Sequence, residues 1–399
     1  MTATAGMAEA SNPLAHFTDA DFDALGREID AIYDAVKADL GERDAHYIRR
    51  LIGIQRRVAL GGRLTILASL AFLPVWQYAL ASWWVFLAII GLGTLARGVG
   101  KILDNMEIGH NVMHGQWDWL RDPAINSRTW EWDSVCPSDL WRHSHNVVHH
   151  CWTNVLGMDR DLGYGPLRVS PRQRWYPGHL VQPLYHLLLA LLFEWGVALH
   201  DVRFGRIRRG EVPFDQARAQ LTRIARKVGR QVMKDYVLWP LLAGPFFLYV
   251  CTANAAASVI RNLWAHMIIF CGHFPAGVYV FTPDQVRNES RGGWCARQML
   301  GSCNIEGGRL FHILSGNLGH QIEHHLFPNL PSHRYAEIAP RVRAICVRYG
   351  LPYNTGSLTR QFGTTVLKIF RMTLPPTPAH RAGAVWRVIG AAGAFPRRT

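Results

Sequence analysis

The histidines of this chain are clustered, and imidazole is a common ligand of transition metals. Eleven of the 19 histidines fall in four short stretches, together with an asparagine and a glutamine. These stretches contain His110 and His114; His143, His145, His149 and His150; Asn262, His266 and His273; and His320, Gln321, His324 and His325. Such a concentration of one ligand type predicts a metal site.

The spacing within the stretches supports this prediction. Residues four apart lie on one face of an α-helix, so His110 and His114 can point at one metal, and so can His145 and His149. His150 is rotated by about 100° from its neighbour and can reach a second metal from the same helix. The adjacent histidines of the last stretch repeat that arrangement. The sequence therefore predicts a centre with two metal ions, formed where separate segments meet.

The ligand set excludes several common metal sites. Structural zinc needs four ligands and has no redox chemistry. The carboxylate type of di-iron site needs two E-x-x-H motifs, and only Glu107 with His110 has this spacing here. Haem needs one or two axial histidines rather than eight. Imidazole suits iron, copper, zinc and nickel, so the choice among these metals stays open at this point.

The three boxes H-x-x-x-H, H-x-x-x-H-H and Q-x-x-H-H resemble those of the membrane fatty acid desaturase family. The resemblance extends over roughly residues 60–350. The flanking sequences N-M-E-I-G-H-N-V-M-H-G-Q-W-D-W and Q-I-E-H-H-L-F-P-N-L-P are similar to bacterial acyl-CoA desaturases of the actinobacterial type. The H-P-G-G motif of a fused cytochrome b5 domain is absent from the sequence. An external electron donor is therefore implied.

The resemblance implies nine metal ligands and no catalytic residue beyond them. These ligands are His110, His114, His145, His149, His150, His273, Gln321, His324 and His325. Two positions stay open: His266, four residues after Asn262, is the rival of His273, and His320 is the rival of Gln321. His143 is an additional candidate for the metal or its surroundings.

The activity implied by the resemblance is an O₂-dependent fatty-acyl desaturation at two non-haem iron ions. The enzyme would introduce a cis double bond into a long-chain acyl substrate, with acyl-CoA favoured. Its electrons would come from a ferredoxin, a cytochrome b5 or a reductase. A membrane di-iron hydroxylase or ketolase is the alternative with the same kind of centre. A non-catalytic metal transporter or sensor is more distant, because it predicts ligands inside the spans, and residues 64–96 contain none.

The composition indicates how these boxes are held. Charged residues make up only 18% of the chain, and its 15 Trp are typical of a protein with aromatic side chains at lipid headgroups. The formal charge of +14 fits cytoplasmic loops near anionic lipid better than nucleic-acid binding, for which no motif is present. Seven scattered cysteines without a C-x-x-C pair indicate a reducing compartment.

We expect an all-α integral membrane protein with about four transmembrane helices in two hairpins and a cytosolic helical cap. Leu64 to Ala96 is uncharged and too long for one span of about 20 residues, and Pro74 marks a turn. Arg63 and Arg97 would then reach the headgroups from the same end. The expected parts are a cytosolic amphipathic segment at 1–56, hairpins at 57–101 and 236–272, cap regions at 102–235 and 273–374, and a flexible tail at 375–399.

Two topologies keep all histidine stretches on one side of the membrane. In one, residues 180–200 lie in the interface and 236–272 form the second hairpin, which keeps the basic stretch 201–234 inside. In the other, each of the two segments spans once. The positive-inside rule favours the first, with the metal centre facing the cytosol at the inner membrane. The basic residues within 203–234 either set this topology or bind a CoA phosphate or the donor protein.

Overall fold

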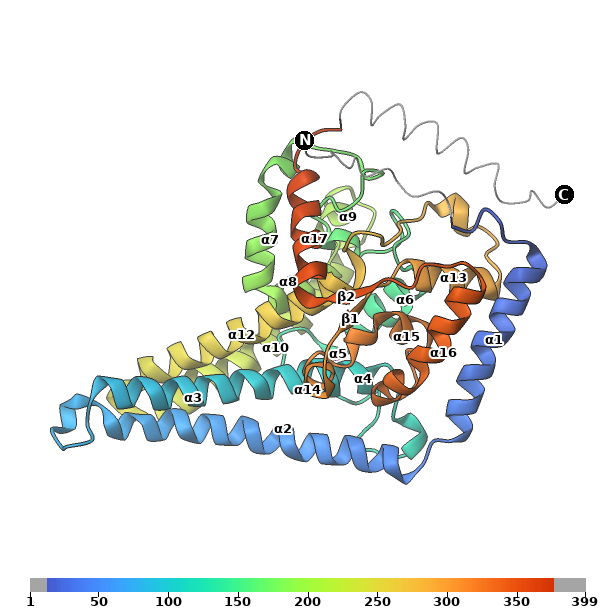
Figure 1. Cartoon of the computed structure of the whole chain (residues 1–399). Helices are drawn as coiled ribbons and strands as arrows, with labels where there is room; N and C mark the ends of the chain where they lie inside the picture. Colours follow the sequence, from blue (N-terminus) through green and yellow to red (C-terminus); the bar gives the residue numbers. More distant parts are fainter. Residues whose placement is uncertain (1–12, 377–399) are drawn as a thin grey trace, which may run out of the picture.

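The computed structural model describes residues 13–376, which fold into a long helical arm and a cap (Figure 1). Most of the expected flexible tail at 375–399 lies outside these residues. The predicted all-α class holds apart from two short strands, β1 (Asn304–Glu306) and β2 (Thr355–Ser357), which pair in parallel.

The first hairpin consists of α2 (Glu42–Ser69) and α3 (Trp83–Ile102), which pack along each other. Two short 3₁₀ turns, η1 (Leu70–Phe72) and η2 (Pro74–Trp76), reverse the chain where Pro74 predicted a break. Both helices are longer than expected: α2 begins before residue 57, and α3 continues through a π-helix, η3 (Leu103–His110), into α4 (Asn111–Met113). One continuous helix therefore leads from the tip of the arm to the first histidine stretch.

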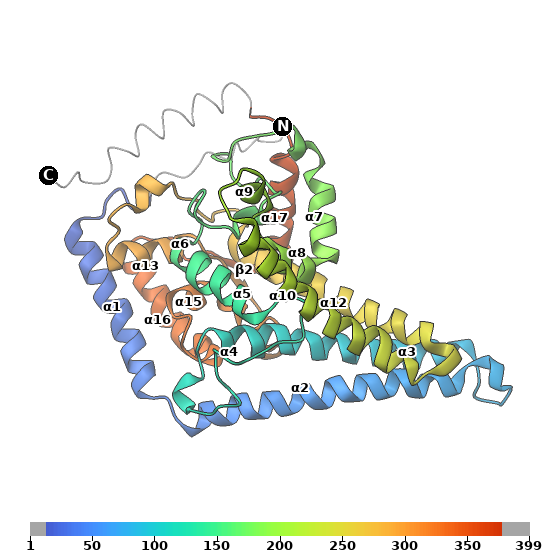
Figure 2. The ribbon, with the colours of Figure 1, turned by 180° about the vertical axis from the view of Figure 1, so that it is seen from behind.

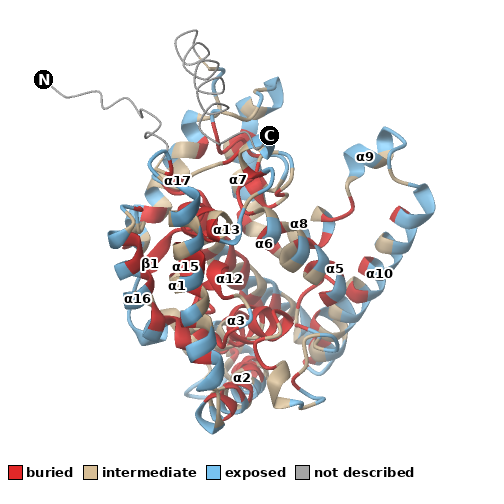
Figure 3. Ribbon diagram, turned by 90° about the vertical axis from the view of Figure 1, so that its right-hand side faces the viewer, coloured by how far each residue is buried: buried red, intermediate tan, exposed pale blue. Residues whose placement is uncertain are grey.

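The second hairpin has a first leg that was not expected. It is formed by the basic helix α10 (Phe214–Val232), the π-helix η8 (Met233–Leu238) and α11 (Trp239–Leu241). After a turn at η9 (Gly244–Phe246), α12 (Phe247–His273) returns to the cap. η8 and α11 pack against α12. Seen from behind, α10 overlaps α12 (Figure 2), but in the view along the arm it stands apart from α12 and α3 (Figure 3). Basic residues assigned to a cap region by the sequence thus lead directly into this hairpin.

Two helices of the described residues are long and apolar enough to cross a membrane, Trp83–Met113 and Gly244–His273. A bent pair, η7 (Pro177–Val181) with α7 (Gln182–Leu191) and then α8 (Phe193–His200), would be a third if it counted as one span. The bend is 100°, so the expected single helix at 180–200 is two helices. Leu184, Leu187 and Leu188 of α7 are exposed, which fits contact with lipid.

The expectation that Arg63 and Arg97 reach the headgroups is wrong. Both side chains turn inward to Asp235, which lies 2.7 Å from Arg63 and 3.2 Å from Arg97. Arg97 also lies 2.9 Å from Asp133, and only 1% of its side chain is exposed. Lys101 completes this buried network. A buried cation needs such partners, because an unpaired charge away from water is costly.

The amphipathic segment expected within 1–56 contains α1 (Asp19–Ala38), which begins with a capping box between Thr18 and Asp21. The cap also contains α16 (Tyr335–Arg348) and α17 (Leu358–Arg371). Figure 3 shows buried residues concentrated in the middle of the cap and exposed ones on α9 and α10. The other cap elements are η4 (Asp118–Leu120), α5 (Ser138–Arg142), η5 (His143–His149), α6 (His150–Trp152), η6 (Leu162–Tyr164), α9 (Phe204–Arg208), η10 (Pro283–Val286), α13 (Arg291–Leu300), α14 (Arg309–Leu314), η11 (Leu318–His320), α15 (Gln321–Leu326) and η12 (Ser332–Arg334).

Candidate metal centre

The first two histidine stretches lie partly on π-helices, where their spacing predicted α-helices, while His114 follows α4 and His150 begins α6. Residues 103–110 form η3 and residues 143–149 form η5. Within η5 the amide of His150 donates to the carbonyl of His145, a bond over five residues. π-Helical turns are rare and are found mostly at functional sites. Sequence spacing alone does not distinguish them from an α-helix.

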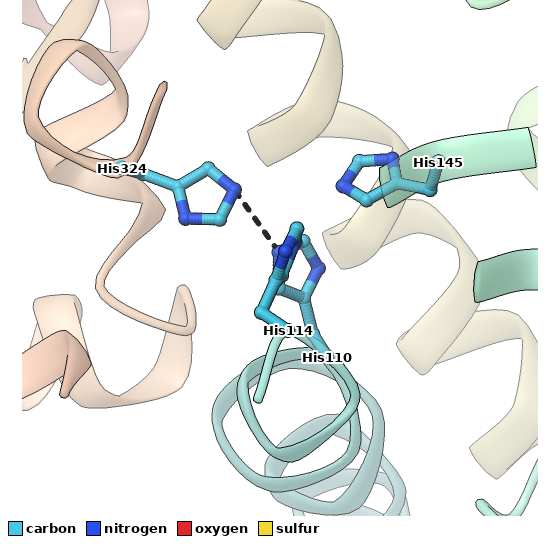
Figure 4. Close-up of side chains that lie close together, drawn as sticks. All are labelled: His110, His114, His145 and His324. Atoms are coloured by element: carbon cyan, nitrogen blue, oxygen red, sulfur yellow. Dashed lines mark hydrogen bonds between the residues drawn. The ribbon is translucent and has the colours of Figure 1, made fainter. Parts of the chain in front are cut away.

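Four rings from three separate segments form the first group (Figure 4). The ligand-capable nitrogens of His110, His114, His145 and His324 all lie within 4.8 Å of one another. The Nε2 atoms of His110 and His324 are 3.3 Å apart, although 214 residues separate them in the sequence. The end of the long arm helix, η5 and α15 therefore meet at one point.

A second group lies directly beside the first. It contains His149, His273 and His325, whose nitrogens also lie within 4.8 Å of one another. The Nε2 atom of His273 is 3.1 Å from that of His325 and 3.0 Å from the side-chain nitrogen of Gln321. His150 lies between the groups, within the same distance of His324 and His325. All nine residues implied by the resemblance are thus gathered in one place.

These rings fit metal ions by distance and, apart from His149, by protonation. Nitrogens bound to one ion at about 2.1 Å lie roughly 3 to 3.5 Å apart, as the closest pairs here do. The Nε2 atoms of His114 and His145 and both ring nitrogens of His150 are buried without a hydrogen-bond partner. Burial holds the pKa of His150 and His324 well below the usual value, so these rings are uncharged. The neutral ring is the form that binds a metal.

Two carboxylates that the sequence analysis did not single out support the rings from behind. His149 donates through Nδ1 to Asp159 at 3.0 Å, and His145 Nδ1 lies 3.4 Å from Asp161. The backbone amides of Asn154 and Asp161 donate to Asp159 and hold it in place. A carboxylate on Nδ1 fixes the tautomer and leaves Nε2 for the metal. The motif M-D-R-D after the second box carries both residues and could have indicated them.

Three other rings are oriented through their Nδ1 atoms by uncharged partners. His325 donates to the side-chain oxygen of Gln298 at 3.0 Å, and His273 to the backbone carbonyl of Gly301 at 3.2 Å. His324 Nδ1 lies 3.4 Å from the hydroxyl of Tyr335. In each case Nδ1 contacts its polar partner and Nε2 faces the cluster. This arrangement is typical of metal-binding histidines.

The four additional candidates from the sequence lie elsewhere. His143 is exposed at the start of η5. The side chain of Asn262 donates a hydrogen bond to the carbonyl of Leu191 and accepts one from the guanidinium of Arg261. His266 stacks on Phe270, and His320 stacks on His312. None of the four belongs to a ligand group among residues 13–376. His143 faces solvent, and the other three side chains pack against neighbouring residues.

A narrow crevice reaches the first group from the side of the arm. His110 and His145 line it together with apolar side chains of η3, α5, α8 and α12. These are Met106, Trp141, Phe193, Ala265 and Ile269. Polar and charged side chains share the lining, among them Asp161, His200 and the buried ion pair of Arg261 with Glu194. The arrangement thus places two groups of ring nitrogens beside a narrow, partly apolar crevice.

Comparison with known proteins agrees with this geometry. The sequence model described as fatty acid desaturase matches residues 81–357, which is more than half of the chain. The NADPH-dependent stearoyl-CoA 9-desaturase of Mycobacterium tuberculosis is 48% identical over 365 residues, covering 90% of this chain and 82% of the relative. The sn-1 linoleoyl-lipid 6-desaturase of Synechocystis is 25% identical, covering 72% of this chain and 81% of the relative. The chain belongs to the fatty acid desaturase family and is an oxidoreductase of that type.

Proposed function

We propose that this enzyme is an O₂-dependent desaturase of long-chain acyl-CoA with two non-haem iron ions. The observation that carries the proposal is the pair of adjacent ring groups beside the crevice. The stearoyl-CoA 9-desaturase activity in the name of the Mycobacterium tuberculosis relative supports stearoyl-CoA as the substrate and carbon 9 as the position. The high identity over most of both chains supports this transfer.

The proposed ligands fall into the two groups. His110, His114, His145 and His324 would hold one ion, while His149, His273, His325 and Gln321 would hold the other. His150 lies between them and would complete either set. Gln321 is preferred to His320, and His273 to His266, because the favoured member of each pair faces the cluster.

Desaturation removes two hydrogens from an unactivated CH₂–CH₂ unit, which no protein acid or base can do at neutral pH. Bound iron with O₂ supplies the required oxidising power. One O₂ accepts two hydrogens from the acyl chain and two electrons with two protons from the donor, and two waters leave. The protein's part is to orient the rings through Asp159 and Asp161 and to hold the acyl chain in the crevice.

We further propose that the arm crosses the inner membrane as four spans in two hairpins. The cap and its ring groups would face the cytosol, with α7 in the interface. The two long apolar helices, Trp83–Met113 and Gly244–His273, support one span in each hairpin, and the exposed leucines of α7 support its place in the interface. Electrons would come from an external ferredoxin, cytochrome b5 or reductase. The basic residues of α10 would lie on the cytosolic side, in agreement with the positive-inside rule.

The test combines product analysis with metal analysis. The purified enzyme is incubated with stearoyl-CoA, an NADPH-driven donor system and air, and the product is identified by mass spectrometry. We expect a loss of two hydrogens at carbons 9 and 10 and about two iron ions per chain. A product that gains oxygen would instead indicate a hydroxylase, and an enzyme without iron would contradict the proposed centre.

A further inference from the structure

A second cavity reaches the ring cluster from the side opposite the crevice. It has a volume of about 440 Å³ and opens at the surface, where residues of α1, α13 and the segment after α15 line it. His114 and His150 form its inner end. Figure 1 places α1 and α13 on the side of the cap away from the arm, whereas α8 and α12 of the crevice lie toward the arm. Within the described residues, the cavity and the crevice share no lining residue.

Charged and polar groups line the cavity at the surface, beside Trp294 and Pro328. Asp30 of α1 and Arg291 of α13 form an ion pair of 2.7 Å there, and both side chains are 47% exposed. Asn329 donates to the hydroxyl of Tyr33 at 2.9 Å beside this pair. An acyl chain placed here would strip water from this exposed pair, which is unfavourable. The ion pair of Arg261 with Glu194 in the crevice is already buried, so an acyl chain there removes no such water. The mouth of the cavity therefore suits small molecules that enter from the aqueous phase.

The inner end of the cavity has an unused hydrogen-bond acceptor. Asn146 donates through its side-chain nitrogen to the carbonyl of Met113 at 2.8 Å. Its side-chain oxygen is buried and has no hydrogen-bond partner in the described residues. Buried acceptors of this kind usually bind an ordered water. The cavity thus has a place for water next to His114 and His150.

The reaction needs two routes to the same centre. Once the acyl chain fills the crevice, the rings on that side are covered, yet O₂ must still arrive and two waters must leave. We propose that the cavity between α1 and α13 is the entry route for O₂ and the exit for water. This inference rests on the proposed function. It assigns to the α1 side of the cap a role separate from substrate binding.

The test closes the mouth and measures the dependence on O₂. In Asn329→Trp a large side chain covers the opening, whereas Asn329→Ala loses the same bond to Tyr33 and leaves the mouth open. Asp34→Trp adds the same bulk at an exposed position of α1 outside the cavity. We expect Asn329→Trp alone to lower kcat/KM for O₂ severalfold with an unchanged KM for stearoyl-CoA. Iron content should match that of the wild type in all three variants.

A second readout does not require turnover. The rate at which a small water-soluble chelator removes iron from the resting enzyme should fall severalfold in Asn329→Trp and stay unchanged in both controls. An unchanged chelation rate together with an unchanged O₂ dependence would overturn the proposal, and so would a raised KM for stearoyl-CoA. Wild-type enzyme without iron would overturn the proposed function and this inference together. If wild type and Asn329→Trp are both loaded with iron and show the same O₂ dependence and the same chelation rate, this inference alone is overturned.

Discussion

The Nδ1 atom of His149 lies 3.0 Å from a carboxylate oxygen of Asp159, and both side chains are buried. Burial disfavours the charged imidazole, but Asp159 and Asp161 outweigh this effect and raise the pKa of His149 to about 9. In the metal-bound enzyme the same carboxylate would orient the neutral ring and increase its basicity. This pair links the second histidine box to the loop that follows it.

Replacing this carboxylate should weaken metal binding. Asp159→Asn keeps the size of the side chain but removes the negative charge behind His149. We expect iron affinity and desaturase activity to fall by about 10- to 100-fold. Iron is measured by mass spectrometry after dialysis against a weak chelator, and activity with saturating iron. Asp284→Asn, at an exposed position, is the control. Unchanged iron retention in Asp159→Asn would contradict the orienting role.

The histidine of α12 that binds metal can be identified by a pair of substitutions. His273 lies 3.1 Å from His325, whereas His266 stacks on Phe270 with ring centroids 3.9 Å apart. We expect His273→Ala to abolish activity and lower the iron content by about one ion per chain. His266→Ala should retain both ions and lose only thermal stability. If His266→Ala loses iron while His273→Ala keeps it, the assignment on this helix is reversed.

The third box gives an analogous comparison between adjacent residues. Gln321 has its side-chain nitrogen 3.0 Å from His273, and its side-chain oxygen is buried without a partner. His320 instead stacks on His312 outside the ring groups. We expect Gln321→Ala to reduce both iron content and activity, and His320→Ala to leave the iron content unchanged. Metal analysis of the two purified variants decides between the residues.

The sequence predicted the residues of the centre better than the structure that supports them. The histidine boxes stand out because their spacing repeats within a few residues. Asp133 and Asp235 gave no such signal, since they lie 36 and 138 residues from Arg97 and meet it only in the folded chain. Arg97 was therefore expected at the headgroups. The sequence also did not predict the π-helix at 143–149, because the residue types in this segment fit an α-helix equally well.

The buried ion-pair network should govern the response to acid. Burial disfavours the charge of Asp133, but Lys101, Arg97 and Lys234 outweigh this effect and hold its pKa well below the usual range. Its contribution to stability is therefore complete above the unfolded pKa of about 4 and is lost as the pH falls further. We expect Asp133→Asn to cost about 3–5 kcal/mol at neutral pH and to flatten the loss of stability below pH ~4.

This prediction is checked by thermal unfolding in detergent between pH 3 and 7. Asp284→Asn again serves as the control, because its carboxylate is 78% exposed. The control should follow the wild-type profile at every pH. If Asp133→Asn shows the wild-type slope below pH ~4, other carboxylates carry the acid response and the network does not.

The packing of the first hairpin depends on two glycines at the contact between α2 and α3. A Cβ atom on Gly93 would lie 2.8 Å from the backbone nitrogen of Ile66 and 3.0 Å from the carbonyl oxygen of Gly62. Backbone atoms cannot move aside as a flexible side chain can, so Gly93→Ala must separate the helices. We expect a destabilisation of about 1–3 kcal/mol, seen as a lower Tm in detergent.

Gly91 provides a matched comparison on the same helix. A Cβ atom there would meet no atom within 4 Å, so Gly91→Ala should leave the Tm unchanged or raise it slightly. Because α3 continues directly into the segment that carries His110, the separation caused by Gly93→Ala should also reduce iron content. Equal Tm values for the two variants would show that the close approach of α2 and α3 does not stabilise the arm. A lower Tm with full iron content would instead limit the effect to the hairpin and leave the metal centre unaffected.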